Sequence, residues 1–132
     1  MRVYLVRHAE AAPGSPDELR PLTDAGRRAA RELGSRLAAD GPLDAVVCSP
    51  LVRAVETAVA ISRSAQAPEP RIEPALAPGA TATALLAAVT GLGSRVVAVA
   101  HQPDCSRIAA ALTGEELPFP PGGVATIEIS VP

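Results

Sequence analysis

The stretch RVYLVRH at residues 2–8 decides how this chain folds, together with its counterpart RVVAVAH at residues 95–101. Each stretch is a short hydrophobic run that ends in a histidine, and the chain contains only these two histidines, His8 and His101. Short apolar runs rich in β-branched residues predict buried strands. In an open α/β sheet, ligands bind beyond the carboxyl ends of the strands. The entire supply of imidazole is therefore predicted to lie where chemistry takes place.

Strand-like and helix-like segments alternate along the rest of the chain. Ser49 is predicted to cap the second helix, with Pro50 at the first helical position. The alternation predicts one α/β domain over residues 1–132, an α/β sandwich with a mostly parallel sheet and a half-polar last strand at its edge. The predicted strands are residues 2–6, 44–48, 71–73, 95–100 and 124–129, and the predicted helices are about 24–39, 50–63, 81–89 and 103–113.

Composition argues against several classes of function. The chain carries 12 basic and 14 acidic residues, a net charge of −2, and no basic block, which argues against binding nucleic acid through its phosphates. No apolar run approaches membrane-spanning length, and the N-terminus leads directly into a strand, so we expect a soluble, cytoplasmic protein that does not bind membranes. Cys48 and Cys105 lack a C-x-x-C spacing and are expected to be small buried hydrophobes.

Two arginines stand out by their positions. Arg7 immediately precedes His8, and Arg53 falls in the first turn of the helix that follows Ser49. A cation is unfavourable in that turn because the amino end of a helix already carries partial positive charge. The conflict disappears if an anion binds there. The alternative is a solvated surface arginine that pairs with Glu56 or Glu69.

The neighbourhood of the histidines predicts an anion site. Arginines near both histidines would repel a divalent cation, so we expect neither a metal nor another cofactor. Two arginines and two imidazoles instead suit a phosphoryl group, because they neutralise it and stabilise charge on its equatorial oxygens.

Four segments, in order, resemble the signature blocks of the histidine phosphatase superfamily, which has the phosphoglycerate mutase-like fold. They are LVRHAE at 5–10, RPLTDAG at 20–26, SPLVRAVET at 49–57 and VAHQP at 99–103. The resemblance implies a three-layer α/β/α sandwich whose five-stranded sheet has the order 3-2-4-1-5, with the last strand antiparallel at the edge. The chain is close to the minimal core of the fold and is most similar to the short SixA-type phosphohistidine phosphatases.

The resemblance also implies roles for individual residues. His8 would be the nucleophile that carries a transient phosphoryl group, and Arg7, Arg53 and His101 would hold the phosphoryl oxygens. Arg20 and Ser49 are implied as further substrate contacts.

Glu10 and Glu73 are the candidates for a general acid. A weak acid costs least when the bond to be broken is a labile P–N bond, since imidazole leaves more easily than an alkoxide. The expected substrate is therefore phosphohistidine on a partner protein. Two alternatives stay open: a small-molecule phosphomonoesterase with the same site, and a non-catalytic phosphate- or phosphoprotein-binding module.

Overall fold

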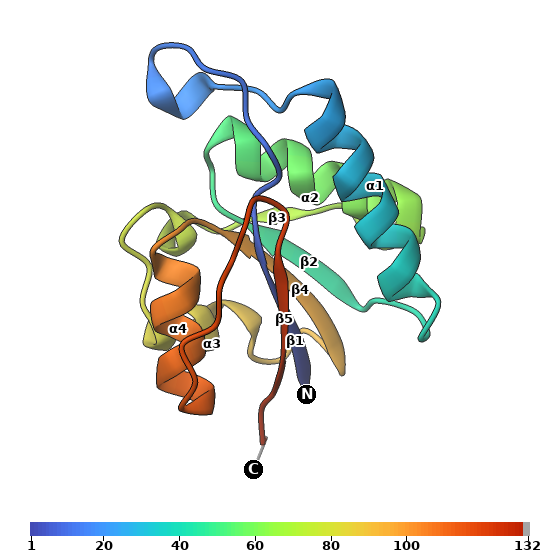
Figure 1. Ribbon diagram of the computed structural model, residues 1–132. Helices are drawn as coiled ribbons and strands as arrows, with labels where there is room; N and C mark the ends of the chain where they lie inside the picture. Colours follow the sequence, from blue (N-terminus) through green and yellow to red (C-terminus); the bar gives the residue numbers. More distant parts are fainter. Residues whose placement is uncertain (131–132) are drawn as a thin grey trace.

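The hydrophobic runs form one five-stranded sheet, as a computed structural model that describes residues 1–130 shows (Figure 1). The strands are β1 (Arg2–Arg7), β2 (Ala45–Cys48), β3 (Arg71–Ile72), β4 (Arg95–Ala100) and β5 (Val124–Glu128). Their order is β3-β2-β4-β1-β5, with β5 antiparallel to β1 and the other neighbours parallel. The implied strand order and the antiparallel edge strand are confirmed.

The register of the two central strands places the histidines side by side. β1 and β4 are parallel neighbours, and Arg7 lies opposite Ala100. The next residues in the chain are His8 and His101, so both histidines lie at the carboxyl ends of these neighbouring strands. The backbone confirms this arrangement, because the N–H of His8 donates to the carbonyl of Ala100 over 3.1 Å.

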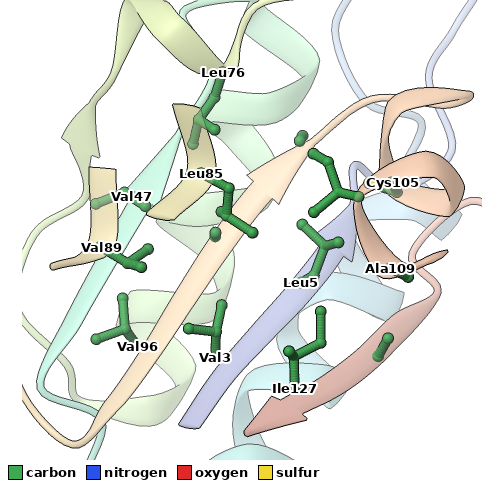
Figure 2. Packing of buried hydrophobic residues seen from close by; sticks show 14 of the residues in the cluster. Val3, Leu5, Val47, Leu76, Leu85, Val89, Val96, Cys105, Ala109 and Ile127 are labelled. Carbon is green, nitrogen blue, oxygen red and sulfur yellow. The ribbon is translucent and has the colours of Figure 1, made fainter. Parts of the chain in front are cut away.

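Four helices cover the sheet, two on each face (Figure 1). Helices α1 (Asp24–Ala38) and α2 (Val52–Ala65) pack on one face, and α3 (Ala82–Val89) and α4 (Asp104–Thr113) pack on the other. Alternate side chains of β1 serve the two faces, as strand geometry requires: Val3 and Leu5 face α3 and α4, whereas Tyr4 and Val6 face α1 and α2. Figure 2 shows the first of these layers. The three-layer sandwich is confirmed.

The amino end of α1 lies directly against the turn that follows His8. Thr23 caps the helix by accepting a hydrogen bond from the N–H of Gly26 over 3.0 Å, and its own N–H donates to the carbonyl of Glu10. Gly26 is so close to that turn that a Cβ atom would stand 2.3 Å from the Glu10 carbonyl oxygen. The glycine of the RPLTDAG segment therefore allows α1 to support the turn behind the histidine.

The start of α2 differs from the prediction. The helix begins at Val52, with Leu51 in the N-cap position and no side-chain cap. Ser49 was expected to be the N-cap, and this was wrong: Ser49 and Pro50 lie before the helix, and the Ser49 hydroxyl is hydrogen-bonded to His101. Arg53 is the second residue of the helix and still lies in its first turn. The unfavourable placement of this cation is therefore real.

The two cysteines are buried and form no disulfide, as expected. Burial raises the pKa of the Cys48 thiol to about 11 and that of the Cys105 thiol to about 12. Both thiols are therefore protonated at neutral pH and act as packing groups. Within residues 1–130, no helix combines the length and the apolar character needed to cross a membrane.

Candidate active site

The two histidines form the centre of the candidate site. Their ring centroids are 5.3 Å apart with the planes tilted by 55°. Both side chains are buried, His8 with 9% and His101 with 3% of its surface exposed. The two rings are therefore close neighbours at the carboxyl ends of β1 and β4.

The hydrogen bonding of His8 determines which nitrogen carries the proton. Its Nδ1 lies 2.8 Å from the carbonyl oxygen of Ala9. A carbonyl oxygen only accepts, so Nδ1 is the donor, and the neutral ring carries an unprotonated Nε2. Burial lowers the pKa of His8, and the positive charges of Arg53 and Arg7 lower it further, against a smaller opposing effect of the Ala9 carbonyl. His8 is thus a neutral imidazole with a free lone pair on Nε2, the form that a nucleophile needs.

A buried threonine fixes the turn that orients this ring. Thr57, in the second turn of α2, accepts a hydrogen bond from the N–H of Ala9 over 3.0 Å. Its hydroxyl donates in turn to the carbonyl of Arg53 over 2.7 Å. The same residue thus connects the turn behind His8 to the part of α2 that carries Arg53. Sequence reasoning assigned no role to Thr57, although it ends the SPLVRAVET segment.

His101 is held by the serine that precedes α2. Its Nε2 lies 2.7 Å from the Ser49 hydroxyl oxygen, which also accepts from the N–H of Leu51 over 3.2 Å. In the tautomer in which the serine donates to Nε2, the ring proton of His101 lies on Nδ1. That Nδ1 is buried and has no partner among residues 1–130. Burial lowers the pKa of His101 to about 4, with smaller contributions from His8 and Arg53.

Arg7 adds a second buried donor without a partner. Its Nη1 donates to the carbonyl of Phe119 over 3.0 Å, which holds the guanidinium in place. Its Nε is buried and has no partner in the described chain. Buried polar groups in proteins are nearly always hydrogen-bonded, so such a group calls for an explanation. An anion bound beside His8 would provide one.

The Arg53 guanidinium is buried, with 7% of the residue exposed, and it is occupied by Asp17. Nη1 donates to the Asp17 carbonyl over 2.9 Å, and Nη2 donates to the carboxylate oxygen Oδ2 over 3.1 Å. The anion that the first-turn arginine requires is supplied here by the protein itself. The alternative partners weighed from the sequence, Glu56 and Glu69, do not bind it.

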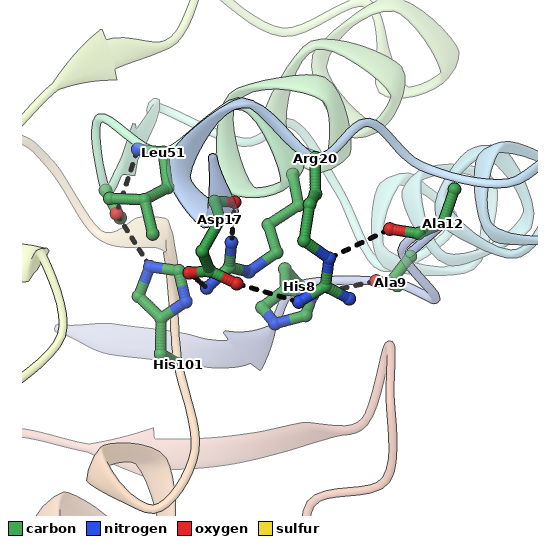
Figure 3. A network of polar contacts seen from close by, with 9 residues as sticks. His8, Ala9, Ala12, Asp17, Arg20, Leu51 and His101 are labelled. Atoms are coloured by element: carbon green, nitrogen blue, oxygen red, sulfur yellow. Dashed lines mark hydrogen bonds and ion pairs between the residues drawn. The ribbon is translucent and has the colours of Figure 1, made fainter. Parts of the chain in front are cut away.

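Asp17 also brings Arg20 to the site, as Figure 3 shows. It lies in a single 3-10 turn, η1 (Asp17–Leu19), and its Oδ1 accepts from Nη1 of Arg20 over 2.9 Å. Nε of Arg20 donates to the carbonyl of Ala12 over 2.9 Å. Hydrogen bonds from Arg20 and then from Arg53 lower the pKa of Asp17, so this carboxyl is ionised at neutral pH. Sequence reasoning missed Asp17; its spacing of three residues before Arg20 was the available signal.

The two candidate acids have other partners. The Glu10 carboxylate accepts from the Thr23 hydroxyl over 2.8 Å on the exposed rim of α1. The Glu73 carboxylate accepts from the N–H of Ala75 and caps the short turn η2 (Pro74–Leu76). Within residues 1–130, no hydrogen bond or ion pair joins either carboxylate to His8 or His101.

Hollows away from the histidines and groups of metal-binding side chains are the other features that could form a site. Two surface hollows of about 290 and 350 Å³ run along α2, and both are lined by Val55, Val59 and Arg63 and by neither histidine. We place the site at the histidines and not at those hollows, because among the described residues the histidines lie beside buried polar atoms without partners. In the part of the chain that the structure describes, no three His, Cys, Asp or Glu side chains are grouped to hold a metal ion.

This chain is similar to known proteins over the segments that form the candidate site. The model of the histidine phosphatase superfamily (branch 1) matches residues 3–78. An uncharacterised protein from Picosynechococcus sp. is 31% identical over 136 residues, which cover 94% of this chain and 82% of that protein.

Solved structures extend the similarity to the whole fold. The structure of the protein histidine phosphatase SixA complexed with tungstate superposes with a TM-score of 0.89 at 25% identity, covering 98% of this chain and 88% of that one. A structure from Agrobacterium tumefaciens, described as a phosphohistidine phosphatase SixA, gives a TM-score of 0.81 at 29% identity and covers 95% of this chain and 89% of that one.

Proposed function

Because this chain belongs to the histidine phosphatase superfamily and is an enzyme of the SixA type, we propose that it hydrolyses phosphohistidine on a partner protein through a phosphoryl intermediate on His8. The observation that carries the proposal is the environment of His8. His8 has an unprotonated Nε2, and two buried nitrogens of its neighbours, Nε of Arg7 and Nδ1 of His101, have no hydrogen-bond partner within residues 1–130. A phosphoryl group there satisfies both donors and meets the nucleophile.

In the first step, the lone pair of His8 Nε2 forms a bond to phosphorus as the P–N bond of the substrate breaks. The electron pair of the broken bond stays on the leaving imidazole, which takes a proton from solvent. His8 becomes a phosphohistidinium, with protonated Nδ1 hydrogen-bonded to the Ala9 carbonyl over 2.8 Å. That hydrogen bond to the charged ring stabilises the intermediate.

In the second step, water forms a bond to phosphorus and the bond to Nε2 breaks. The water releases a proton to solvent, inorganic phosphate leaves, and neutral His8 is restored. Arg7, Arg53 and His101 hold the equatorial oxygens in both steps, where charge builds up in the transition state.

Among residues 1–130, no carboxyl group is hydrogen-bonded to His8 or His101, and this favours phosphohistidine over phosphate esters as the substrate. The carboxylate nearest to the arginines, Asp17, has a lowered pKa and is ionised at neutral pH. General acid catalysis contributes about 10²–10⁴-fold when the leaving group needs a proton. An imidazole leaving group needs that assistance less than an alkoxide, so a site without an acid acts best on a P–N bond.

A substrate comparison tests the proposal. We expect kcat/KM on a polypeptide chemically phosphorylated on histidine to exceed that on alkyl phosphate monoesters by at least about 100-fold, following the contribution of a general acid. His8→Ala should abolish both activities. Equal or greater activity on the alkyl esters would favour a small-molecule phosphomonoesterase, and full activity of His8→Ala would exclude the mechanism.

A further inference from the structure

Asp17 occupies the arginine donors that the proposed function gives to the phosphoryl group. Every hydrogen bond that the Arg53 side chain makes within residues 1–130 ends on Asp17, at 2.9 Å on its carbonyl and 3.1 Å on its carboxylate. The second carboxylate oxygen accepts from Arg20 over 2.9 Å. A carboxylate and a phosphoryl group present the same kind of anionic oxygen to the same fork of N–H groups. The two anions therefore compete for Arg53.

The two sides of this contact differ in how firmly they are held. The Arg53 side chain is 9% exposed and is fixed in α2, whereas the Asp17 side chain is 58% exposed in the short turn η1. Within residues 1–130, the Asp17 carboxylate accepts hydrogen bonds from Arg53 and Arg20 and from no other group. Water can therefore take over the carboxylate when it leaves, while the guanidinium stays in place for the incoming group.

Charge also opposes simultaneous binding of the Asp17 carboxylate and a phosphoryl group to Arg53. The Asp17 carboxyl is ionised, and it lies close enough to His101 to raise that histidine's pKa against the larger lowering effects. A phosphoryl dianion that contacts His101 and Arg53 would face this carboxylate at short range. Like charges in one small site repel, so a bound phosphoryl group disfavours the ionised Asp17 carboxylate beside Arg53.

We propose that Asp17 is an internal ligand of the anion site that weakens the binding of free phosphate, the product of the reaction, by returning to Arg53 as the phosphate leaves. This inference rests on the proposed function, because it takes Arg53 as a ligand of the phosphoryl group. It gives Asp17 a positioning role, in which it acts on the reaction through Arg53 and limits product inhibition.

The substitution Asp17→Asn tests the proposal, with tungstate as a non-hydrolysable probe of the anion site. Asn keeps the shape of the side chain and removes its charge. We expect tungstate to bind the variant about three- to tenfold more tightly than wild type in calorimetric titration, as loss of two partly exposed ion pairs allows. Inorganic phosphate should inhibit hydrolysis of p-nitrophenyl phosphate with an inhibition constant lower by the same factor. Structural damage would weaken binding instead, so the sign separates the two effects.

Glu18→Gln is the matched control. Glu18 lies in the same turn, is exposed, and forms none of the hydrogen bonds or ion pairs found in residues 1–130. Its substitution makes the same charge change and should alter tungstate affinity less than twofold. Asp17→Ala serves as a second variant with the same expected tightening. Unchanged or weaker tungstate binding in both Asp17 variants, or equal tightening by Glu18→Gln, would overturn the proposal.

One further variant separates failure of this inference from failure of the proposed function. Arg53→Gln should weaken tungstate binding whatever Asp17 does. If Arg53→Gln binds tungstate as well as wild type, Arg53 is not an anion ligand, and the proposed function falls together with the inference. If only the Asp17 variants fail to tighten binding, the inference alone is wrong.

Discussion

Replacing Thr57 by valine tests how the turn behind the candidate nucleophile is held. The Thr57 side chain is fully buried, and its hydroxyl accepts from the N–H of Ala9 and donates to the carbonyl of Arg53. Valine has nearly the same shape and volume, so the substitution removes these two hydrogen bonds without creating a large cavity.

The two lost hydrogen bonds differ in cost. The Arg53 carbonyl lies inside α2, where the amide four residues ahead also bonds to it, so it retains a partner. The Ala9 N–H is buried, and within residues 1–130 Thr57 is its only partner. A buried donor left unsatisfied costs about 1–3 kcal/mol. We therefore expect Thr57→Val to lower the free energy of unfolding by about 1–3 kcal/mol.

The same change should reduce activity, because the Ala9 carbonyl that orients His8 belongs to the loosened turn. A misplaced catalytic group costs roughly 10- to 100-fold in rate. Urea unfolding followed by circular dichroism measures the stability, and hydrolysis of p-nitrophenyl phosphate measures the activity.

Thr90→Val is the control for the Thr57 experiment. The Thr90 hydroxyl also donates to a carbonyl four residues earlier, that of Leu86, but it lies at the exposed end of α3. Its loss should change the free energy of unfolding by less than about 0.5 kcal/mol. If Thr57→Val unfolds at the same urea concentration as wild type and retains full activity, the turn does not depend on this hydroxyl and the reasoning is refuted.

Two further predictions concern the groups around the reacting nitrogen. Protonation of His8 removes the lone pair on Nε2, and burial lowers the pKa of His8 below its ordinary value of 6.5. The value of kcat/KM for p-nitrophenyl phosphate should therefore fall as the pH drops through this lowered pKa. An acidic limb at or above pH 6.5 in the pH–rate profile would contradict a neutral nucleophile. Arg53→Lys keeps the positive charge but loses the planar guanidinium with its paired N–H groups. This substitution should lower kcat/KM by about 100-fold or more without a comparable loss of thermal stability. Activity within threefold of wild type would show that the guanidinium geometry is not needed.

Much of the fold follows from short-range signals. The histidine-terminated runs predict β1 and β4 because an apolar strand buried on both faces needs an uninterrupted hydrophobic sequence. The half-polar alternation of the last strand predicts an edge, and β5 has that alternating burial. Strand order depends on long-range pairing, and it was available only through the family resemblance.

The start of α2 shows where local rules fail. Ser49 followed by Pro50 has the pattern of a helix start, but His101, at the end of the neighbouring strand β4, binds the serine hydroxyl. A partner distant in sequence thus overrides the local preference. Arg53 shows the opposite case, because a cation in the first turn conflicts with the helix dipole and so indicates an anionic partner, which in this structure is the Asp17 carboxylate.

The sequence offered only one local signal for Asp17, its spacing of three residues before Arg20, and nothing that connected it to Arg53. It lies in a proline-rich loop whose path is set by contacts with α2 and not by any periodic pattern. Thr57 was missed for a related reason, since a threonine in a helical segment gives no sign that its hydroxyl serves a distant turn. Both residues act through contacts that form only when the chain has folded.

The most direct test of the central claim is to locate the phosphoryl group during turnover. The enzyme is mixed with p-nitrophenyl phosphate, quenched in alkali within the first turnover, digested, and mapped by mass spectrometry. Because the chain contains two histidines, the assignment is unambiguous. Phosphate that is stable to base and labile to acid should be found on His8 and should be absent from His101 and from the His8→Ala variant. Phosphate on His101, or full turnover by His8→Ala, would contradict the account.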